Sequence, residues 1–137
     1  LTVDELLSKA RMAVRSSQLL LDADDLDGAC NRAYYAMFDA ARAALLATGT
    51  TPSLASIKTH SGLISAFSLQ LVKTGKVSVD LGKAINKVED LRLVADYKGD
   101  IIEVEQVAWA QEQARVFVAT MEKLIDDLPP LPTPTDT

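Results

Sequence analysis

Four side chains with chemical potential follow one another at helical spacing in the first third of the chain: Arg32, Tyr35, Asp39 and Arg42. Residues three or four apart are neighbours on a helix surface, so Tyr35 is expected to reach Asp39, and Asp39 to reach Arg42. Such a row could be a solvated stripe of ion pairs, each of which contributes little to stability. Arg32 and Asp39 are two turns apart and could be joined only through the long arginine side chain or a shared ligand.

The helix that carries this row is predicted from Leu26 to Leu46, with an end near Gly49. Its sequence, LDGACNRAYYAMFDAARAALL, is rich in alanine and has high helix propensity. Two apolar rows follow the helical period beside the polar stripe. They consist of Leu26, Cys30, Ala33, Met37, Ala40 and Ala44, and of Tyr34, Phe38, Ala41 and Leu45. This helix is therefore expected to be buried over more than half of its circumference and to lie at the centre of the fold.

Apolar periodicity and helix-ending residues predict further helices on either side of this one. Their expected ranges are 2–21, 59–75, 78–99 and 103–127. Short connections between successive helices favour antiparallel neighbours. The sequence thus predicts an all-α, antiparallel up-and-down bundle of four to five helices over residues 1–128. A proline-rich tail follows at 129–137, to which no function is assigned.

Capping chemistry supports these boundaries. Thr2 and Glu5 have the spacing of a capping box, Ser78 suits the start of the fourth helix, and Asp24 or Asp25 can cap the central helix.

Several residues outside the central helix have expected positions of their own. In the last helix, Val104 begins the apolar seam, whereas Trp109 and Phe117 fall partly off it, which suggests a second apolar contact with a partner subunit. His60, at the start of the third helix, is expected from its position alone to bond to backbone. Arg92 lies within helical reach of two carboxylates, those of Glu89 and Asp96.

Composition narrows the possible functions. The 137 residues form one domain, and a net charge of −5 argues against broad electrostatic capture of nucleic acid, so any RNA or nucleotide contact must be local. One cysteine, Cys30, and one histidine cannot form a disulfide or a zinc cluster, and no metal or cofactor is expected. No membrane span or secretory signal is visible, which predicts a cytoplasmic protein.

Three stretches, in order, resemble the HEPN superfamily, specifically its small stand-alone bacterial and archaeal members. They are NRAYYAMFDAARAALL (31–46), which resembles the central helix of that superfamily, KTHSGLISAF (58–67) and LRLVADY (91–97). The resemblance implies a bundle of four or five antiparallel helices that forms a homodimer. It also implies a frequent genetic partner, a minimal nucleotidyltransferase that acts as antitoxin to the HEPN toxin.

Active members of this superfamily resemble metal-independent ribonucleases that use an arginine and a histidine of the central helix. The histidine would remove the proton of a 2′-hydroxyl group, and the arginine would hold the phosphate. Here Arg32 matches the arginine, but Asp39 stands where close relatives carry the histidine. A carboxylate is a weaker base than imidazole and repels phosphate. Some relatives are silenced by nucleotidylation of a tyrosine; the matching position is Ala41, and Tyr34 nearby is expected in the core.

Three hypotheses follow. In the first, a HEPN dimer binds RNA, a nucleotide or a nucleotidyltransferase through the central helix without efficient cleavage. In the second, the protein is an active metal-independent endoribonuclease toxin with Asp39 or His60 as proton acceptor. In the third, it is a structural helical adaptor whose stripe is covered by its dimer mate. The predicted site comprises Arg32 and Asp39 at the catalytic positions, and Asn31, Tyr35, Arg42, His60 and Arg92 as binding or wall residues.

Overall fold

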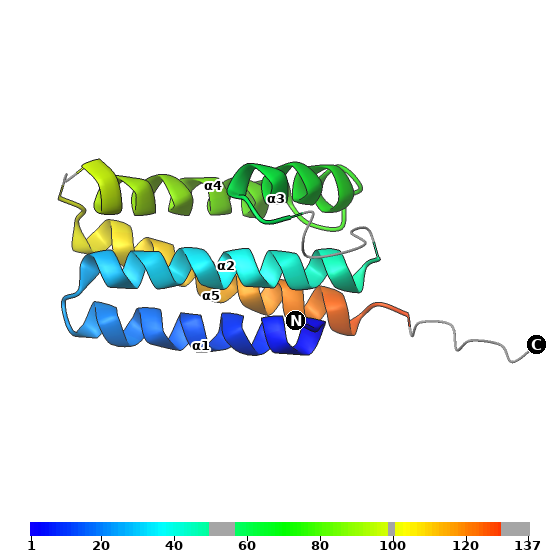
Figure 1. Ribbon diagram of the computed structural model, residues 1–137, viewed down its shortest axis with the longest axis horizontal. Helices are drawn as coiled ribbons and strands as arrows, with labels where there is room; N and C mark the ends of the chain where they lie inside the picture. Colours follow the sequence, from blue (N-terminus) through cyan, green and yellow to red (C-terminus); the bar gives the residue numbers. More distant parts are fainter. Residues whose placement is uncertain (50–56, 99–100, 130–137) are drawn as a thin grey trace, which may run out of the picture.

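The computed structural model describes residues 1–49, 57–98 and 101–129, and over these ranges its regular structure is helical (Figure 1). The helices are α1 (Val3–Asp22), α2 (Leu26–Ala47), α3 (His60–Phe67), α4 (Val79–Leu93) and α5 (Val104–Asp126). Two π-helical turns, η2 (Ser68–Val72) and η3 (Val94–Lys98), continue α3 and α4. The prediction of an all-α bundle is confirmed.

The four long helices run alternately up and down, and the short α3 lies in the same layer as α4, near one end of the bundle (Figure 1). α2 packs against α1, α3, α4 and α5, which confirms its predicted place at the centre. Only one side of α2 is left for polar side chains, because its other sides are covered by these neighbours.

Local capping explains where the helices begin. Thr2 and Glu5 form the expected capping box at α1, in which the Thr2 hydroxyl accepts the Glu5 backbone N–H at 3.1 Å. Asp25, Thr59 and Ser78 each accept a backbone N–H three residues further on, at 2.9, 3.0 and 3.2 Å. These bonds satisfy amides that have no partner within the helix. Of the two aspartates considered for α2, the second is therefore the cap.

Small side chains build the centre of the core. The alanines of α2 at 29, 33, 36, 40, 41, 43 and 44 are fully buried. Because alanine occupies little volume, neighbouring helices can approach α2 closely. Larger side chains fill the space beyond: Phe67 of α3 stacks on Phe117 of α5, with ring centroids 5.6 Å apart.

The structure corrects three expectations. Phe117 is fully buried in the core, so of this predicted pair Trp109, which is 38% exposed, is the one left to offer an apolar contact at the surface of α5. Val104 is 51% exposed, because the first residue of α5 precedes the part of the helix that packs on the bundle. The third helix changes at Phe67 into the π-helical turn η2, short of the predicted end at residue 75.

Two expectations fall wholly or largely outside the described residues: the end of the fourth helix at residue 99 and the proline-rich tail, of which residues 130–137 are not described. Within the described ranges, none of the helices combines the length and the apolar character that a membrane crossing requires.

Candidate functional site

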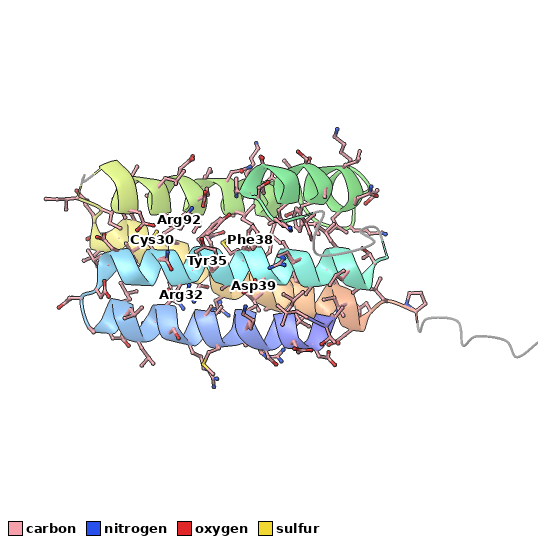
Figure 2. The ribbon with its side chains drawn as sticks, in the orientation of Figure 1. Cys30, Arg32, Tyr35, Phe38, Asp39 and Arg92 are labelled. Carbon is pink, nitrogen blue, oxygen red and sulfur yellow. The ribbon has the colours of Figure 1, made fainter. Side chains whose placement is uncertain are left out.

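The polar stripe lies along one side of α2, as the spacing predicts. Figure 2 shows Arg32, Tyr35 and Asp39 along α2, with Arg92 of α4 near Tyr35. Asp39 is buried, with 8% of the residue exposed, and Arg32, Tyr35 and Arg42 are half-buried. The stripe is therefore partly withdrawn from solvent, which strengthens its electrostatic interactions relative to those on an open surface.

Arg32 forms no ion pair within the described residues. Its Nε and Nη2 atoms donate to Asn31 Oδ1 at 3.3 and 3.1 Å, and its Cζ atom lies 5.4 Å from the Tyr35 ring centroid. Within the described part of the chain, no carboxylate comes within ion-pair distance of its guanidinium group. An arginine oriented by a neutral amide and an aromatic ring is free to bind an external anion.

Asp39 interacts chiefly with cations. Its Oδ1 atom lies 3.6 Å from Arg42 Nη1, as predicted. Burial raises the pKa of Asp39 above its usual value, and the charges of Lys9, Arg42 and Arg32 offset part of this rise. The expected contact with Tyr35 is not formed by a hydrogen bond; the Tyr35 ring lies instead between the arginines at 32 and 92.

Arg42 is only partly satisfied. Its Nε atom is buried and has no hydrogen-bond partner within the described residues, and its Cζ atom lies 5.5 Å from the Phe38 ring centroid. A buried donor without an acceptor costs free energy, so the Arg42 position is not stabilised by hydrogen bonds at this atom.

Arg92 links α4 to α2 with its charge already compensated. Its guanidinium group donates to both carboxylate oxygens of Glu89 at 2.9 and 3.0 Å, and to Asp96 at 3.2 Å. The same group lies over the ring of Tyr34, 4.8 Å from its centroid, and 5.5 Å from that of Tyr35. With two carboxylates and two rings around it, Arg92 supports the wall of the site more than it offers charge to a ligand.

His60 is held by side chains and not by backbone, which corrects the expectation drawn from its position. Its Nε2 atom lies 3.0 Å from Asn86 Oδ1, and its Nδ1 atom lies 2.8 Å from the Tyr34 hydroxyl. Since the amide oxygen can only accept, Nε2 carries a proton and donates it to Asn86, while Nδ1 shares a hydrogen bond with the Tyr34 hydroxyl. Tyr34 is 2% exposed, as expected of a core residue, and burial raises the pKa of its hydroxyl. Both nitrogens of the imidazole are thus engaged.

The polar stripe therefore lies on α2, His60 on α3 and Arg92 on α4. The Tyr34 side chain of α2 contacts both His60 and Arg92. Two partners were not identified from the sequence: Asn86 and Lys9. Each lies far along the chain from the group it faces, and no local spacing could indicate it.

The larger hollows of the surface lie elsewhere. Grooves of about 570 and 510 Å³ run between α1 and α5 and between α4 and α5, and Arg32, Asp39 and Arg42 line neither. Small molecules usually need an enclosed pocket, whereas an extended chain or a protein surface can bind a shallow face. Within the described residues, no group of three or more histidine, cysteine or carboxylate side chains could hold a metal ion.

Comparisons with known proteins agree with this architecture. The sequence matches the HEPN domain family over residues 3–129. A UPF0332 protein of Thermotoga maritima is 40% identical over 123 residues, which are 88% of each chain. A Methanocaldococcus jannaschii protein named "Putative toxin MJ0142" is 29% identical over 124 residues, 90% of this chain and 81% of its own. The crystal structure of TT1696 from Thermus thermophilus has the same fold, with a TM-score of 0.69, 21% identity, and coverage of 89% of this chain and 97% of that one.

Proposed function

Because this chain belongs to the HEPN domain family, we propose that it is a toxin-like protein that binds phosphate groups of RNA or nucleotides through α2 without efficient cleavage. One observation carries the proposal. Arg32 has no carboxylate partner within the described residues, whereas the acid at position 39 pairs with Arg42.

The geometry suits phosphate binding. The Arg32 guanidinium is oriented by Asn31 and the Tyr35 ring, so little side-chain freedom remains to be lost when an anion binds. A half-buried position also weakens the competition from water.

The same geometry is unfavourable for cleavage. A ribonuclease of this type needs a base that can take a proton from a 2′-hydroxyl group. Asp39 is a poor candidate, because its negative charge repels the phosphate and its carboxylate lies beside Arg42. His60 is a poor candidate as well, because both ring nitrogens are engaged, one by the Tyr34 hydroxyl and the other by Asn86.

A titration of fluorescently labelled single-stranded RNA, followed by anisotropy, tests the binding. Arg32→Ala should weaken binding roughly ten-fold or more, because a charge-assisted contact contributes ~1.5–3 kcal/mol. Arg115→Ala is the matched control, since Arg115 is an exposed arginine of α5 that pairs with Glu112. Equal affinities of wild type, Arg32→Ala and Arg115→Ala would refute the proposal.

A cleavage assay with the same RNA tests whether the protein binds without efficient cleavage. We expect no cleavage above background for the wild type and gain of cleavage in Asp39→His, which places an imidazole two helical turns from Arg32 on the stripe. Cleavage by the wild type that is lost in Arg32→Ala would instead establish an active ribonuclease.

The proposal extends to partners. A homodimer would place two such stripes in one assembly, and a minimal nucleotidyltransferase would be the partner that neutralises a toxin-like protein. Light scattering of the purified protein tests the first, and co-purification with the product of an adjacent nucleotidyltransferase gene tests the second. Co-purification that survives in Arg115→Ala but is lost in Arg32→Ala would place that partner on the α2 face; a wild-type protein that is monomeric and does not co-purify would refute the extension.

A further inference from the structure

The stripe has a second basic end. Arg42 lies ten residues after Arg32 on the same helix, and its buried Nε atom has no hydrogen-bond partner within the described residues. Asp39 beside it is 3.6 Å from Arg42 Nη1 and compensates one charge. That buried atom cannot meet an external ligand, but the Arg42 side chain as a whole is 18% exposed, and its terminal nitrogens can donate to a further oxygen ligand.

Lys9 of α1 contributes a positive charge near Asp39 and Arg42. Leu6 and Leu7 of α1 pack with Ala43 of α2, and α1 and α2 run in opposite directions (Figure 1). One turn further along α1, Lys9 therefore comes level with Asp39, and its charge acts on that carboxylate. Lys9 is exposed and makes no ion pair among the described residues, so its ammonium group is available to a ligand.

The two basic ends are too far apart for one phosphate group. Ten residues of α-helix correspond to roughly 15 Å along the axis at ~1.5 Å per residue. On α2, Arg32 and Arg42 carry two positive charges against the single negative charge of Asp39, whereas the whole chain has a net charge of −5. Lys9 adds a positive charge from α1, where Asp4 and Glu5 line the same hollow. The positive charge of the stripe is thus spread along α2 and not gathered at one point.

We propose that Lys9 and Arg42 form a second phosphate subsite, and that the ligand is a single-stranded RNA segment whose backbone runs along α2 from Arg32 to this subsite. The inference rests on the proposed function and deepens it, because it distinguishes an oligonucleotide from a mononucleotide. Single-stranded nucleic acids are commonly bound by grooves or lines of positive charge that follow the backbone.

Competition binding with ligands of increasing length tests this inference. Uridine monophosphate, a dinucleotide and longer oligouridylates compete with labelled RNA for wild type, Lys9→Gln and Lys123→Gln. Lys123 is the matched control, because it is an exposed lysine of α5 that pairs with Asp127. Circular dichroism verifies that each variant is folded.

We expect the longer oligouridylates to bind at least about ten-fold more tightly than the monophosphate. Lys9→Gln should weaken only the longer ligands, by roughly three- to five-fold, and should lower the slope of log affinity against log salt by about 0.7, the value for one phosphate contact with a single strand. Lys123→Gln should leave both quantities unchanged.

Two failures are distinguishable. The second subsite is overturned if affinity does not depend on ligand length. It is also overturned if Lys9→Gln behaves like Lys123→Gln while Arg32→Ala still weakens binding. Either result leaves the proposed function standing. Wild-type protein that binds none of these ligands overturns both.

Discussion

Replacing Asp39 with asparagine is expected to tighten RNA binding, although it removes an ion pair from the site. The Asp39 carboxylate is the one negative charge in the row formed with Arg32, Arg42 and Lys9. Asparagine has nearly the same shape, so the substitution changes the charge and little else. It also frees Arg42 from its present partner.

The expected magnitude follows from Coulomb's law, taking the carboxylate and a bound phosphate to be about two helical turns apart or less. Two unit charges about 8 Å apart interact by roughly 2 kcal/mol at an effective dielectric constant of about 20. Screening over a Debye length of about 8 Å at physiological ionic strength reduces this to about 1 kcal/mol. Removal of the repulsion between the carboxylate and a bound phosphate should therefore raise affinity about five-fold.

Anisotropy titrations at low and at near-physiological salt measure this change, with Asp90→Asn as the control, because Asp90 is an exposed aspartate of α4. The gain should be larger at low salt. Asp39→Asn that binds RNA no better than Asp90→Asn, or more weakly than wild type, would refute the assignment of this face to phosphate.

The pH dependence supplies an independent check of the same residue. Because burial raises the folded-state pKa of Asp39, the ionised form is disfavoured by the fold, and Asp39→Asn should be slightly more stable than wild type at neutral pH. As the pH falls through the raised pKa towards the unfolded value of about 3.9, the free energy of unfolding of the wild type should approach that of Asp39→Asn. Urea unfolding at several pH values measures it, and an Asn variant that is less stable at neutral pH would contradict the reasoning.

Three further predictions concern the scaffold. Phe67→Ala removes a buried ring that stacks on Phe117 and should lower the free energy of unfolding by ~3–5 kcal/mol in urea titrations; a loss below about 1 kcal/mol would contradict the described core. His60→Ala removes the partner of the buried Tyr34 hydroxyl and should cost ~1–3 kcal/mol in the same titration, so unchanged stability would show that the hydrogen bond does not contribute. Burial raises the pKa of the Cys30 thiol to about 11, so a thiol reagent should label it at neutral pH only after unfolding, and rapid labelling of the folded protein would refute its burial.

Much of the fold could be predicted from the sequence because its signals are local. The capping residues Thr2, Asp25 and Ser78 act on amides within one turn of themselves, and the apolar period of α2 reports which sides are covered. The pair of Asp39 and Arg42 was predictable for the same reason, since three residues separate them on one helix.

The rest of the candidate site depends on contacts between helices. His60 meets Tyr34 and Asn86 at separations of 26 residues in both directions, and no periodic pattern encodes such a meeting. Lys9 reaches the stripe only through the register of α1 on α2. Phe117 was misplaced because the arrival of α3 turns an apparently off-seam position into core.

The alanine packing of α2 restricts how this helix can change. Any larger side chain on its buried sides would push a neighbouring helix away, so the sequence there is limited by volume. The polar stripe is the side of α2 that is not packed with alanine, and its side chains there carry charge or a polar ring. On the proposed function, a carboxylate in place of an imidazole at position 39 changes the chemistry of this side and leaves the alanine packing of the scaffold as it is.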